Sequence, residues 1–477
     1  MVITLSMMLV ISGCTATKSK FETSFNDKLL TPTDLANPIG SQTKGAITTA
    51  QNNIAKNPTA VIVTQPKKTT AQKMYLSSIV LLALEQNPTI NIARWQAESA
   101  DAKMQLAKTK YRPKIEYSFS IGPEAAYASA SDDVISHIRS ETSVTLSQLI
   151  YNFGKTSQEV DAAQNATISA QKRLAHKITT TLYDVSDIYL KVLEQDLLIG
   201  NSYENEKAHK KTYQLVKISE QGGNATIADV QKAFTRLEGA RTQTIDMLSQ
   251  RQRSASEFRR LTGVAPENLS IPKVKSNNAG LKLSDIQKYF DRHPFMQSLL
   301  IDIKSLKHQK TALERSYLPQ LTLEGTAGTK DNVGSDGPMN ADARIQLALR
   351  GVLFDGGNRK AKIAQIYAKI GEKTARFRKA QYDVENEIND AIRILETAKS
   401  KRTSIKKRIK ASEDVVRLYT EQFKAGERGI FELLDAQQEL FAARAEQISN
   451  RYDVLRANYS AQKLTGTLIP NLLGNEE

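Results

Sequence analysis

The chain has 477 residues, which is enough for two or three ordinary domains or for one elongated one. It carries 66 Lys and Arg against 51 Asp and Glu, a formal net charge of +15. These cations are spread along segments with helical patterning and accompany no nucleic-acid recognition motif, so we expect no nucleic-acid partner. The single cysteine, Cys14, excludes a disulfide within one chain.

The first residues have the pattern of a bacterial export signal. The apolar run MVITLSMMLV is followed by Ile11-Ser12-Gly13-Cys14, which resembles a lipobox, the site at which a cysteine is lipidated and becomes the new N-terminus. We therefore expect residues 1–13 to be a signal peptide, Cys14 to carry a lipid and residues 14–73 to form a flexible tether. The alternatives are an ordinary signal peptide with a chance cysteine and a start assigned at the wrong residue. No other segment reaches the roughly 18 apolar residues of a spanning helix, so any membrane passage must be made by strands.

One pattern of residues occurs twice along the rest of the chain. YRPKIEYSFSIG at 111–122 matches YLPQLTLEGTAG at 317–328, an offset of 206 residues, and LIYNFGK at 149–155 matches VLFDGGN at 352–358, an offset of 203. A separation this constant indicates an internal duplication. The chain then divides into a first repeat at 74–270, a linker at 271–280, a second repeat at 281–467 and a tail at 468–477.

Each repeat has the same order of expected elements. A helix of about 35–40 residues ends at a proline, a strand hairpin follows at 113–152 or 319–355, and two long helices joined by a glycine turn complete the repeat. Toward Phe423, apolar residues recur at alternating spacings of four and three. This pattern predicts one helix from Gly357 to Phe423, about 100 Å long and supercoiled with its neighbours.

The hairpin segments alternate between apolar and polar residues. Ile115, Tyr117 and Phe119 share one face, and polar residues lie between them. The alternating segments run roughly nine to twelve residues, the length of a tilted strand that crosses a bilayer, with polar loops expected at 122–141 and 328–343. Four strands cannot close a barrel, and unpaired edges are costly in hydrocarbon, so the chain must pool its strands with copies of itself. Three copies are the smallest assembly wide enough for a pore.

These features together resemble the TolC-type outer-membrane channel family. The resemblance covers residues 74–470 and rests on the duplicated strand units, on LFDGG before a long helix, on KAGERGIFELLDAQQEL at 424–440 and on its counterpart SEQGGNATIADVQKAF at 219–234. It implies a mainly α fold with a membrane β-barrel. Long antiparallel coiled-coil helices would form a periplasmic α-barrel, and the four strands of each chain would join a twelve-stranded barrel in a homotrimer.

The resemblance also implies a function in export and a place in the outer membrane, in contact with its lipid and extending into the periplasm. The channel would pass substrate to the exterior from a periplasmic adaptor (membrane fusion) protein and an inner-membrane ABC or proton-driven transporter. The long segment of the first repeat from Tyr189 to Gly263 resembles members that serve type I protein secretion more than members that serve drug efflux. Drug or metal efflux is the alternative within the family, and a periplasmic adaptor or coiled-coil scaffold protein is the alternative of another class.

Signals of catalysis are poor. The five histidines are scattered without ligand spacing, and no GxSxG motif occurs. Gly154-Lys155-Thr156 lacks the earlier glycine of a phosphate loop, and Asp331, Asn332, Asp336 and Asn340 do not have the spacing of a calcium loop. We therefore expect no enzymatic activity, no cofactor and no metal site.

The resemblance places a gate at the periplasmic tips of the long helices. An acidic ring at the constriction would consist of Glu432 and Asp435, which lie three residues apart on one side of a helix; an ordinary acidic first turn is the alternative. Phe423, which stands where the family usually has a tyrosine, and Arg428 would tie the tips together, with Asp229 as the partner in the first repeat. The turn glycines would be Gly154, Gly223, Gly357 and Gly426.

Overall fold

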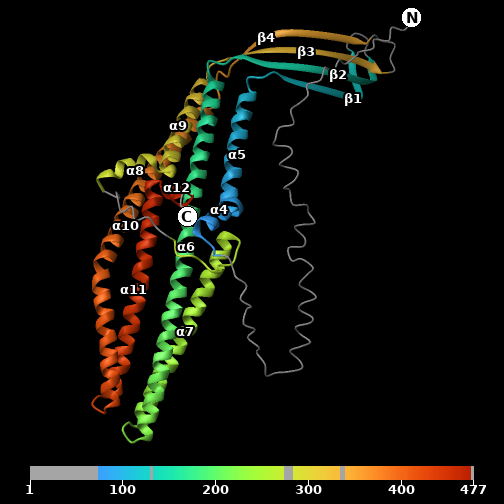
Figure 1. The fold of residues 1–477 in the computed structure, drawn as a ribbon. Coiled ribbons are helices and arrows are strands. Elements are labelled where there is room, and N and C mark those ends of the chain that lie inside the picture. The colour runs from blue at the N-terminus through green and yellow to red at the C-terminus, as the bar shows by residue number, and fades with distance from the viewer. Residues whose placement is uncertain (1–72, 129–132, 273–282, 334–338, 474–477) are drawn as a thin grey trace, which may run out of the picture. The chain divides into compact units, whose positions relative to one another are not determined.

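The computed structural model describes residues 73–128, 133–272, 283–333 and 339–473, all of which belong to the unit Ala71–Glu477. The expected signal peptide, Cys14, most of the tether and most of the linker at 271–280 lie outside the described residues. Figure 1 shows the elements, which occur in the order α4 (Leu76–Gln86), α5 (Pro88–Thr109), β1 (Lys114–Ala128), β2 (Asp133–Tyr151), α6 (Lys155–Gln221), α7 (Ile227–Thr262), the 3-10 turn η1 (Leu283–Asp285), α8 (Ile286–Arg292), α9 (Pro294–Arg315), β3 (Gln320–Val333), β4 (Asn340–Arg350), α10 (Asn358–Lys424), α11 (Ile430–Thr465) and α12 (Leu468–Leu473).

The internal duplication is confirmed by the lengths of equivalent helices. α6 and α10 both contain 67 residues, α7 and α11 both contain 36, and α5 and α9 both contain 22. At 1.5 Å per residue, α6 and α10 are each about 100 Å long. The bounds of α10 lie within one residue of those that the heptad pattern and its flanking glycine predict.

The long helices lie side by side in a layer. α6 contacts α5 and α7 along one side and α9 and α11 along another, and α10 packs on α9 and α11. The order across the layer is therefore α5 with α7, then α6, then α9 with α11, and finally α10 (Figure 1). On α10 the residues Val384, Ile388, Ala391, Ala398 and Ile405 are buried, as the heptad seam predicts.

The helix expected before each strand hairpin is in fact two helices. α4 ends at Gln86 and α5 begins at Pro88, and in the second repeat α8 ends at Arg292 and α9 begins at Pro294. The residue before each proline is extended, with ψ of 120° and 115°, because the proline ring clashes with a helical conformation there. The prediction of one continuous helix of about 35–40 residues is therefore wrong.

The four strands form one antiparallel sheet in the order β1-β2-β3-β4. β2 pairs with β3, so the sheet joins the hairpins of the two repeats. The strands contain 15, 19, 14 and 11 residues, and the first three are longer than expected. The polar segments predicted as loops supply the additional paired residues, because strand pairing continues through both sides of each of them.

The two faces of this sheet differ in chemistry. The register places Ile115 opposite Leu146, Leu146 opposite Gly325, and Gly325 opposite Ile345, and on this face Tyr117 is 86% exposed. The other face carries polar pairs, such as the hydroxyls of Ser118 and Ser143 at 2.8 Å and the carboxylate of Glu324 with Arg350. No described helix packs extensively against the sheet, so its apolar face is uncovered, and β1 and β4 each have one edge without a strand partner within the described residues.

The end of the chain packs on the helical core. Residues 468–477 were expected to be a tail, but Leu468–Leu473 form the short helix α12. Leu468 and Leu472 are buried in a cluster that includes residues of α4, α6 and α11. The segment is too short to show a helical period by itself, and its contacts with the core give it a defined structure.

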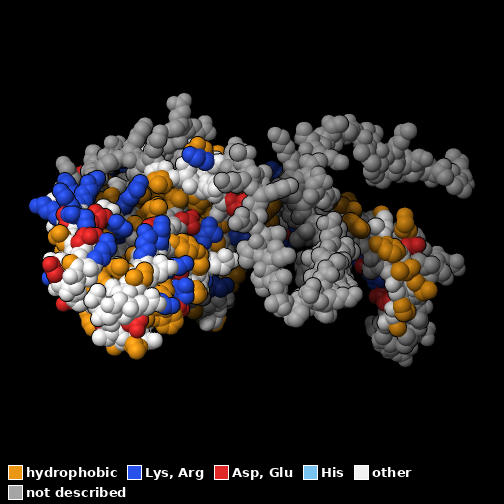
Figure 2. Space-filling view, turned by 60° about the horizontal axis from the view of Figure 1, so that its bottom comes forward, with side chains coloured by type: hydrophobic (Ala, Val, Ile, Leu, Met, Phe, Trp, Pro, Cys, Tyr) orange, Lys and Arg blue, Asp and Glu red, His pale blue; other side chains and the backbone are white. Residues whose placement is uncertain are grey.

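The excess positive charge of the chain is concentrated in α10. This helix contains 18 Lys and Arg and nine Asp and Glu, whereas the equally long α6 contains nine of each. Figure 2 shows Lys and Arg side chains gathered on the side of the molecule where α10 lies. α10 therefore has a net charge of +9, which is more than half of the +15 of the whole chain.

None of the described helices combines the length and the apolar character needed to cross a membrane. Within the same described ranges, His, Cys, Asp and Glu side chains form no group of three or more that could hold a metal ion.

Candidate functional site

Two helix hairpins end close together at the side of the helical layer farthest from the sheet. Gly223 follows α6 and Gly426 follows α10, with φ of +79° and +76°, a left-handed conformation that only glycine adopts without strain. Just beyond them, the backbone N–H of Asn224 donates to Ser219 O at 2.8 Å, and that of Glu427 donates to Gln422 O at 2.9 Å. These bonds satisfy the last carbonyls of both helices and turn the chain back sharply.

A small apolar cluster joins the two hairpins just above their turns. Val216 of α6 and Ala233 of α7 pack with Phe423 of α10 and with Leu433 and Leu434 of α11. Nearby, the Gln437 Nε2 donates to Thr212 Oγ1 at 2.8 Å, and both residues are buried. The hairpins of one chain are therefore held together at their tips by their own contacts.

The expected acidic residues lie on the exposed side of α11. Glu432 and Asp435 are both exposed, whereas Leu433 and Leu434 between them are buried in the cluster. Asp435 accepts a hydrogen bond from Arg236 Nη2 of α7 at 3.0 Å, a partner that the sequence did not indicate. One of the two acidic charges is thus paired within the chain.

The three residues expected to tie the tips make other contacts within one chain. Phe423 is buried in the cluster between the hairpins. The guanidinium of Arg428 lies 4.0 Å from the centre of the Tyr419 ring, and its Nε donates to Gln422 Oε1 at 2.7 Å. Asp229 forms a capping box with Thr226 at the start of α7. No hydrogen bond or ion pair joins Arg428 to Asp229 within the described chain, so a contact between them across neighbouring chains stays a prediction.

The comparison with protein families decides the identity of this layered, duplicated chain. The sequence model described as "Outer membrane efflux protein" matches residues 79–264 and 286–467, one range in each repeat. The chain belongs to the outer membrane efflux protein family. The predicted membership of the TolC-type channels is confirmed, and the family consists of channels and not enzymes.

Individual members of the outer membrane efflux protein family align along most of the chain. This chain is 22% identical over 411 residues to the outer membrane efflux protein BepC of Brucella suis. The alignment covers 84% of this chain and 87% of BepC. The chain is 22% identical over 403 residues to the alkaline protease secretion protein AprF of Pseudomonas aeruginosa, covering 79% and 81%. The solved structure of the Campylobacter jejuni CmeC outer membrane channel superposes with a TM-score of 0.75 at 16% identity, covering 82% of this chain and 86% of CmeC.

Glycine also marks the junction between each strand hairpin and the long helix that follows it. Gly154 and Gly357 precede α6 and α10 with φ of +77° and +89°. The carboxylate of Asp355 accepts from the backbone N–H of Gly357 and from Arg359, whose guanidinium lies 3.3 Å from the centre of the Tyr317 ring. The Arg359 hydrogen bond lowers the pKa of Asp355. This junction is ordered by local contacts that the sequence did not reveal.

Two histidines from different repeats meet in the middle of the helical layer. The ring of His176 on α6 lies 5.5 Å from that of His293, the residue before Pro294, and 5.1 Å from Phe295. Burial lowers the pKa of His176 to about 4, and the same cause lowers the pKa of His293 to about 4. The charge of nearby Lys463 acts in the same direction, so both rings are neutral at pH 7.

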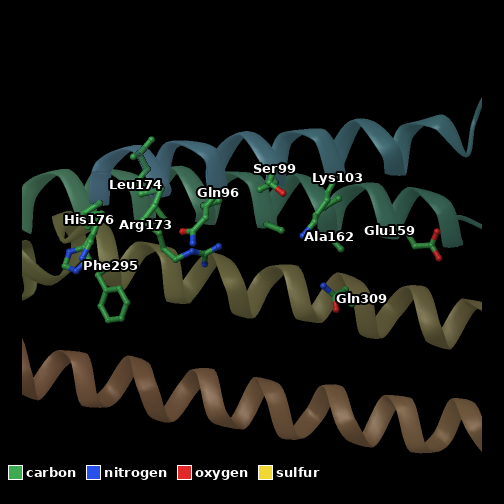
Figure 3. Close-up of a pocket in the computed structure, with 18 residues that line it drawn as sticks. Gln96, Ser99, Lys103, Glu159, Ala162, Arg173, Leu174, His176, Phe295 and Gln309 are labelled. Carbon is green, nitrogen blue, oxygen red and sulfur yellow. The ribbon is translucent and has the colours of Figure 1, made fainter. Parts of the chain in front are cut away.

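A groove of about 910 Å³ runs along α6 between α5 and α9. Figure 3 shows Ala162 on its floor, with Gln96 and Lys103 on α5 and Gln309 on α9 along its sides. Most of its lining is small or apolar, and its charged side chains stand apart along its length. The groove therefore has the character of a packing surface between helices.

Proposed function

We propose that three copies of this chain form an outer-membrane channel that belongs to a tripartite export system. One observation carries this proposal: among the described residues, the four-stranded sheet has an apolar face that no helix covers, a polar face and two edges without a strand partner. In hydrocarbon, an apolar face can contact lipid, but an unpaired edge leaves backbone groups unsatisfied. Pairing β4 of one chain with β1 of the next removes every edge, and three copies would close twelve strands into a barrel.

The helical layer has the same two open edges as the sheet. Its order runs from α5 and α7 to α10, as the sheet runs from β1 to β4. On α7 the apolar side chains of Phe234 and Ile245 are 42% and 64% exposed. The residues 203 positions later on α11, Gln437 and Ile448, pack against α6. We infer that α7 packs on α10 of a neighbouring chain as α11 packs on α6 within the chain.

The polar face of the sheet would line the water-filled side of the barrel. Arg139 contacts Glu124 at 2.7 Å and Glu141 at 2.6 Å, and all three side chains belong to the polar register. Such pairing keeps charged groups satisfied while the opposite face stays apolar. The helices would then continue the passage into the periplasm, with the paired tips at its inner end.

At those tips, we propose that Glu432 and Asp435 form the acidic ring of the gate, and that Arg428 and Asp229 hold the tips of neighbouring chains together. Phe423 is buried between the two hairpins of its own chain and holds those two tips together. The exposure of both carboxylates near the turn supports the first assignment. The position of Arg428 beside the turn supports the second, because its guanidinium is anchored on Tyr419 and is held at the end of the hairpin. Acidic groups around a narrow aperture favour cations over anions.

For partners and cargo, we propose a periplasmic adaptor, an inner-membrane ABC or proton-driven transporter, and secretion of a protein. The similarity to AprF, an alkaline protease secretion protein, supports protein cargo. The similarity to BepC, an efflux protein, supports small-molecule efflux as the second candidate. Cells that lack the chain separate the two: loss of a large protein from the medium supports secretion, and a gain in drug sensitivity without that loss supports efflux.

We also propose that Cys14 carries a lipid that anchors the chain in the outer membrane. The lipobox-like residues before it support this assignment. Labelled palmitate should be incorporated into the wild-type chain and not into Cys14→Ala. Equal labelling of both would place the modification elsewhere.

The channel itself is tested with the full chain purified in detergent. Light scattering should give the mass of three chains, and insertion into a planar bilayer should give stepwise conductance. The sample should migrate as an oligomer before heating and as a single chain afterwards. A stable single chain in detergent without conductance would contradict the proposal.

A further inference from the structure

One exposed surface of α10 carries positive charge without local compensation. Lys399, Arg402, Lys406, Lys407 and Lys410, which we call the basic stripe, are all exposed. Within the described chain none of them forms an ion pair, although their neighbours Arg393 and Arg408 do. Four of the five follow one another at spacings of three, four and four residues, which places them along one face of the helix.

The basic stripe is not a requirement of the repeated fold. The equivalent positions of α6, 203 residues earlier, carry both charge signs and uncharged side chains: Asp196, Ile199, Tyr203, Glu204 and Lys207. α6 has the same length and the same kind of glycine cap, and like α10 it is followed by a helix of 36 residues. The positive charges of α10 are therefore not needed for the helix to fold, and another role has to explain them.

The lysines of the basic stripe point away from α11, the helix that α10 packs against at this level, whereas Arg402 lies about 40° from Ala398 and borders that contact. Ala398 is buried against α11, where its carbonyl accepts a hydrogen bond from Asn450 Nδ2 at 3.1 Å, and Ile405 is buried one heptad later. Each residue of a helix is turned by about 100° from the one before it. Lys399 and Lys406, each one position further along, therefore lie well to one side of this seam.

The basic stripe also points away from the open edge of the layer. Glu194 and Asn201 of α6 bond to α11, and their equivalents on α10 are Thr397 and Ser404, which would face the next chain. Lys399 lies two positions beyond Thr397, a rotation of about 200°. In a closed ring, both neighbours of a helix lie toward its inner half. A surface turned away from both neighbours is therefore the outer one, and the basic stripe faces the periplasm.

The chemistry of the basic stripe selects its partner. Between 393 and 410 there is no aromatic residue on which a base or a sugar ring could stack. Four of the five cations are lysines, which bind carboxylates as point charges, and from Lys399 to Lys410 the stripe extends about 17 Å along the helix axis. A helix lying alongside would present acidic side chains at the same three- and four-residue spacing, as charged positions do beside coiled-coil seams.

We propose that the basic stripe is the docking surface for an acidic helical segment of a periplasmic partner protein. The proposal rests on the proposed function, because only a closed ring of copies makes this face an outer surface. Single exposed ion pairs contribute little, but several in register steer a partner to one position and make its binding sensitive to salt. A ring of three chains would present three such surfaces.

The test compares two triple charge reversals in the full-length protein in detergent. K399E/K406E/K410E reverses three of the five charges of the basic stripe. K207E/K210E/K211E makes the same change in charge at exposed residues of α6, about two turns nearer the tip on average. The probe is a fluorescent helical peptide with glutamates at three- and four-residue spacing; a twin with glutamines and soluble cell-wall glycan fragments serve as comparisons. Wild type and the α6 variant should bind the glutamate peptide with the same affinity. The affinity of the stripe variant should be lower by a factor of about 10 or more.

Binding of the peptide should fade between about 0.05 and 0.5 M salt, and the glutamine twin should not bind. Equal binding by the wild type and the stripe variant would overturn the proposal, as would stronger binding of the glycan fragments than of the peptide. Mass and bilayer conductance are measured on the same samples. If the wild type is a conducting trimer that does not bind the peptide, only the proposed docking surface is contradicted. If it is a single chain without conductance, the proposed function is contradicted.

Discussion

The two repeats differ most between their longest helices. α6 and α10 both span 67 residues and both follow a left-handed glycine, yet 23 residues of α6 are buried and only ten of α10. α6 has neighbours on both sides in the layer, whereas α10 has described neighbours on one side only. The same helical pattern therefore occurs once in a complete environment and once at an open edge. This difference explains why so much of α10 is exposed, and it identifies the side at which a second chain would pack.

The open edge can be broken while most contacts within one chain stay in place, although Phe234 would lose its contact with the Tyr213 ring, whose centre lies 5.7 Å away. Phe234→Glu combined with Ile245→Glu places two charges on the exposed side of α7, and we expect loss of the trimer because both side chains would be desolvated at the junction between copies. Light scattering in detergent measures the effect. Tyr203→Glu on α6, which is 50% exposed and equivalent to Lys406 of the outer surface, is the matched control. Persistent trimers of the α7 variant would contradict the arrangement.

The tips offer a comparison of opposite sign. Glu432→Ala with Asp435→Ala should lower the preference of the channel for cations, because it removes negative charge from the aperture. Arg236→Ala should raise the preference, because it removes the cation that pairs with Asp435 at 3.0 Å. Reversal potentials in a salt gradient measure both, and we expect changes of a few-fold. The same selectivity in all three proteins would mean that the constriction lies elsewhere.

The glycines before α6 and α10 should respond unequally to the same change. Gly357→Ala forces a side chain into a left-handed conformation, at a cost of about 1–2 kcal/mol. Gly154→Ala should destabilise the fold more, because its new Cβ would displace the guanidinium of Arg315, whose Nη1 donates a hydrogen bond to Gly154 O at 3.2 Å, whereas nothing lies within 4 Å at Gly357. Thermal unfolding midpoints compare the two variants. A larger loss at Gly357 would contradict this reading of the two junctions.

The histidine contact between the repeats should give a small dependence on pH. The pKa of His176 and of His293 is about 4 when folded, below the usual 6.5 of an unfolded chain. The unfolded chain therefore takes up protons first as the pH falls, so stability is fully present above about pH 6.5 and is lost below it. Between pH 7 and 6 the loss should be less than about 1 kcal/mol for each histidine. In His176→Gln with His293→Gln the dependence should flatten; an unchanged slope would assign it to other groups.

Periodic features of the fold were predictable from the sequence. The heptad pattern and the flanking glycine located α10 to within one residue, because burial along a long helix repeats regularly. Alternation assigned Tyr117 and Phe119 to one face of a strand for the same reason. Strand ends were not predictable: beyond Gly122, polar residues fit a loop and a solvated strand equally well. The break before Pro88 has a local signal, because a proline disfavours the helical conformation of the residue before it. The expectation of one continuous helix did not take this effect into account.

The site was predictable only in its local parts. Gly223, Gly426 and the exposed acidic turn of α11 follow from short-range rules of helix ends. The capping box of Thr226 and Asp229 also has a local signature, a threonine followed three residues later by an acidic residue at the start of a helix. The pairing of Asp435 with Arg236 joins positions 199 residues apart and has no local signature. Such contacts depend on how the two hairpins pack against each other. A short segment of sequence does not contain this information.

The uncovered sheet has a consequence for the life of a newly made chain. A single chain exposes the apolar face of its sheet, and the free edges of β1 and β4 can form hydrogen bonds with the backbone of another protein. In water, the exposed apolar face favours aggregation. In lipid, the unpaired strand edges leave backbone groups without hydrogen bonds. If copies close the barrel as proposed, a newly made chain therefore needs a chaperone that shields these strands until the oligomer forms.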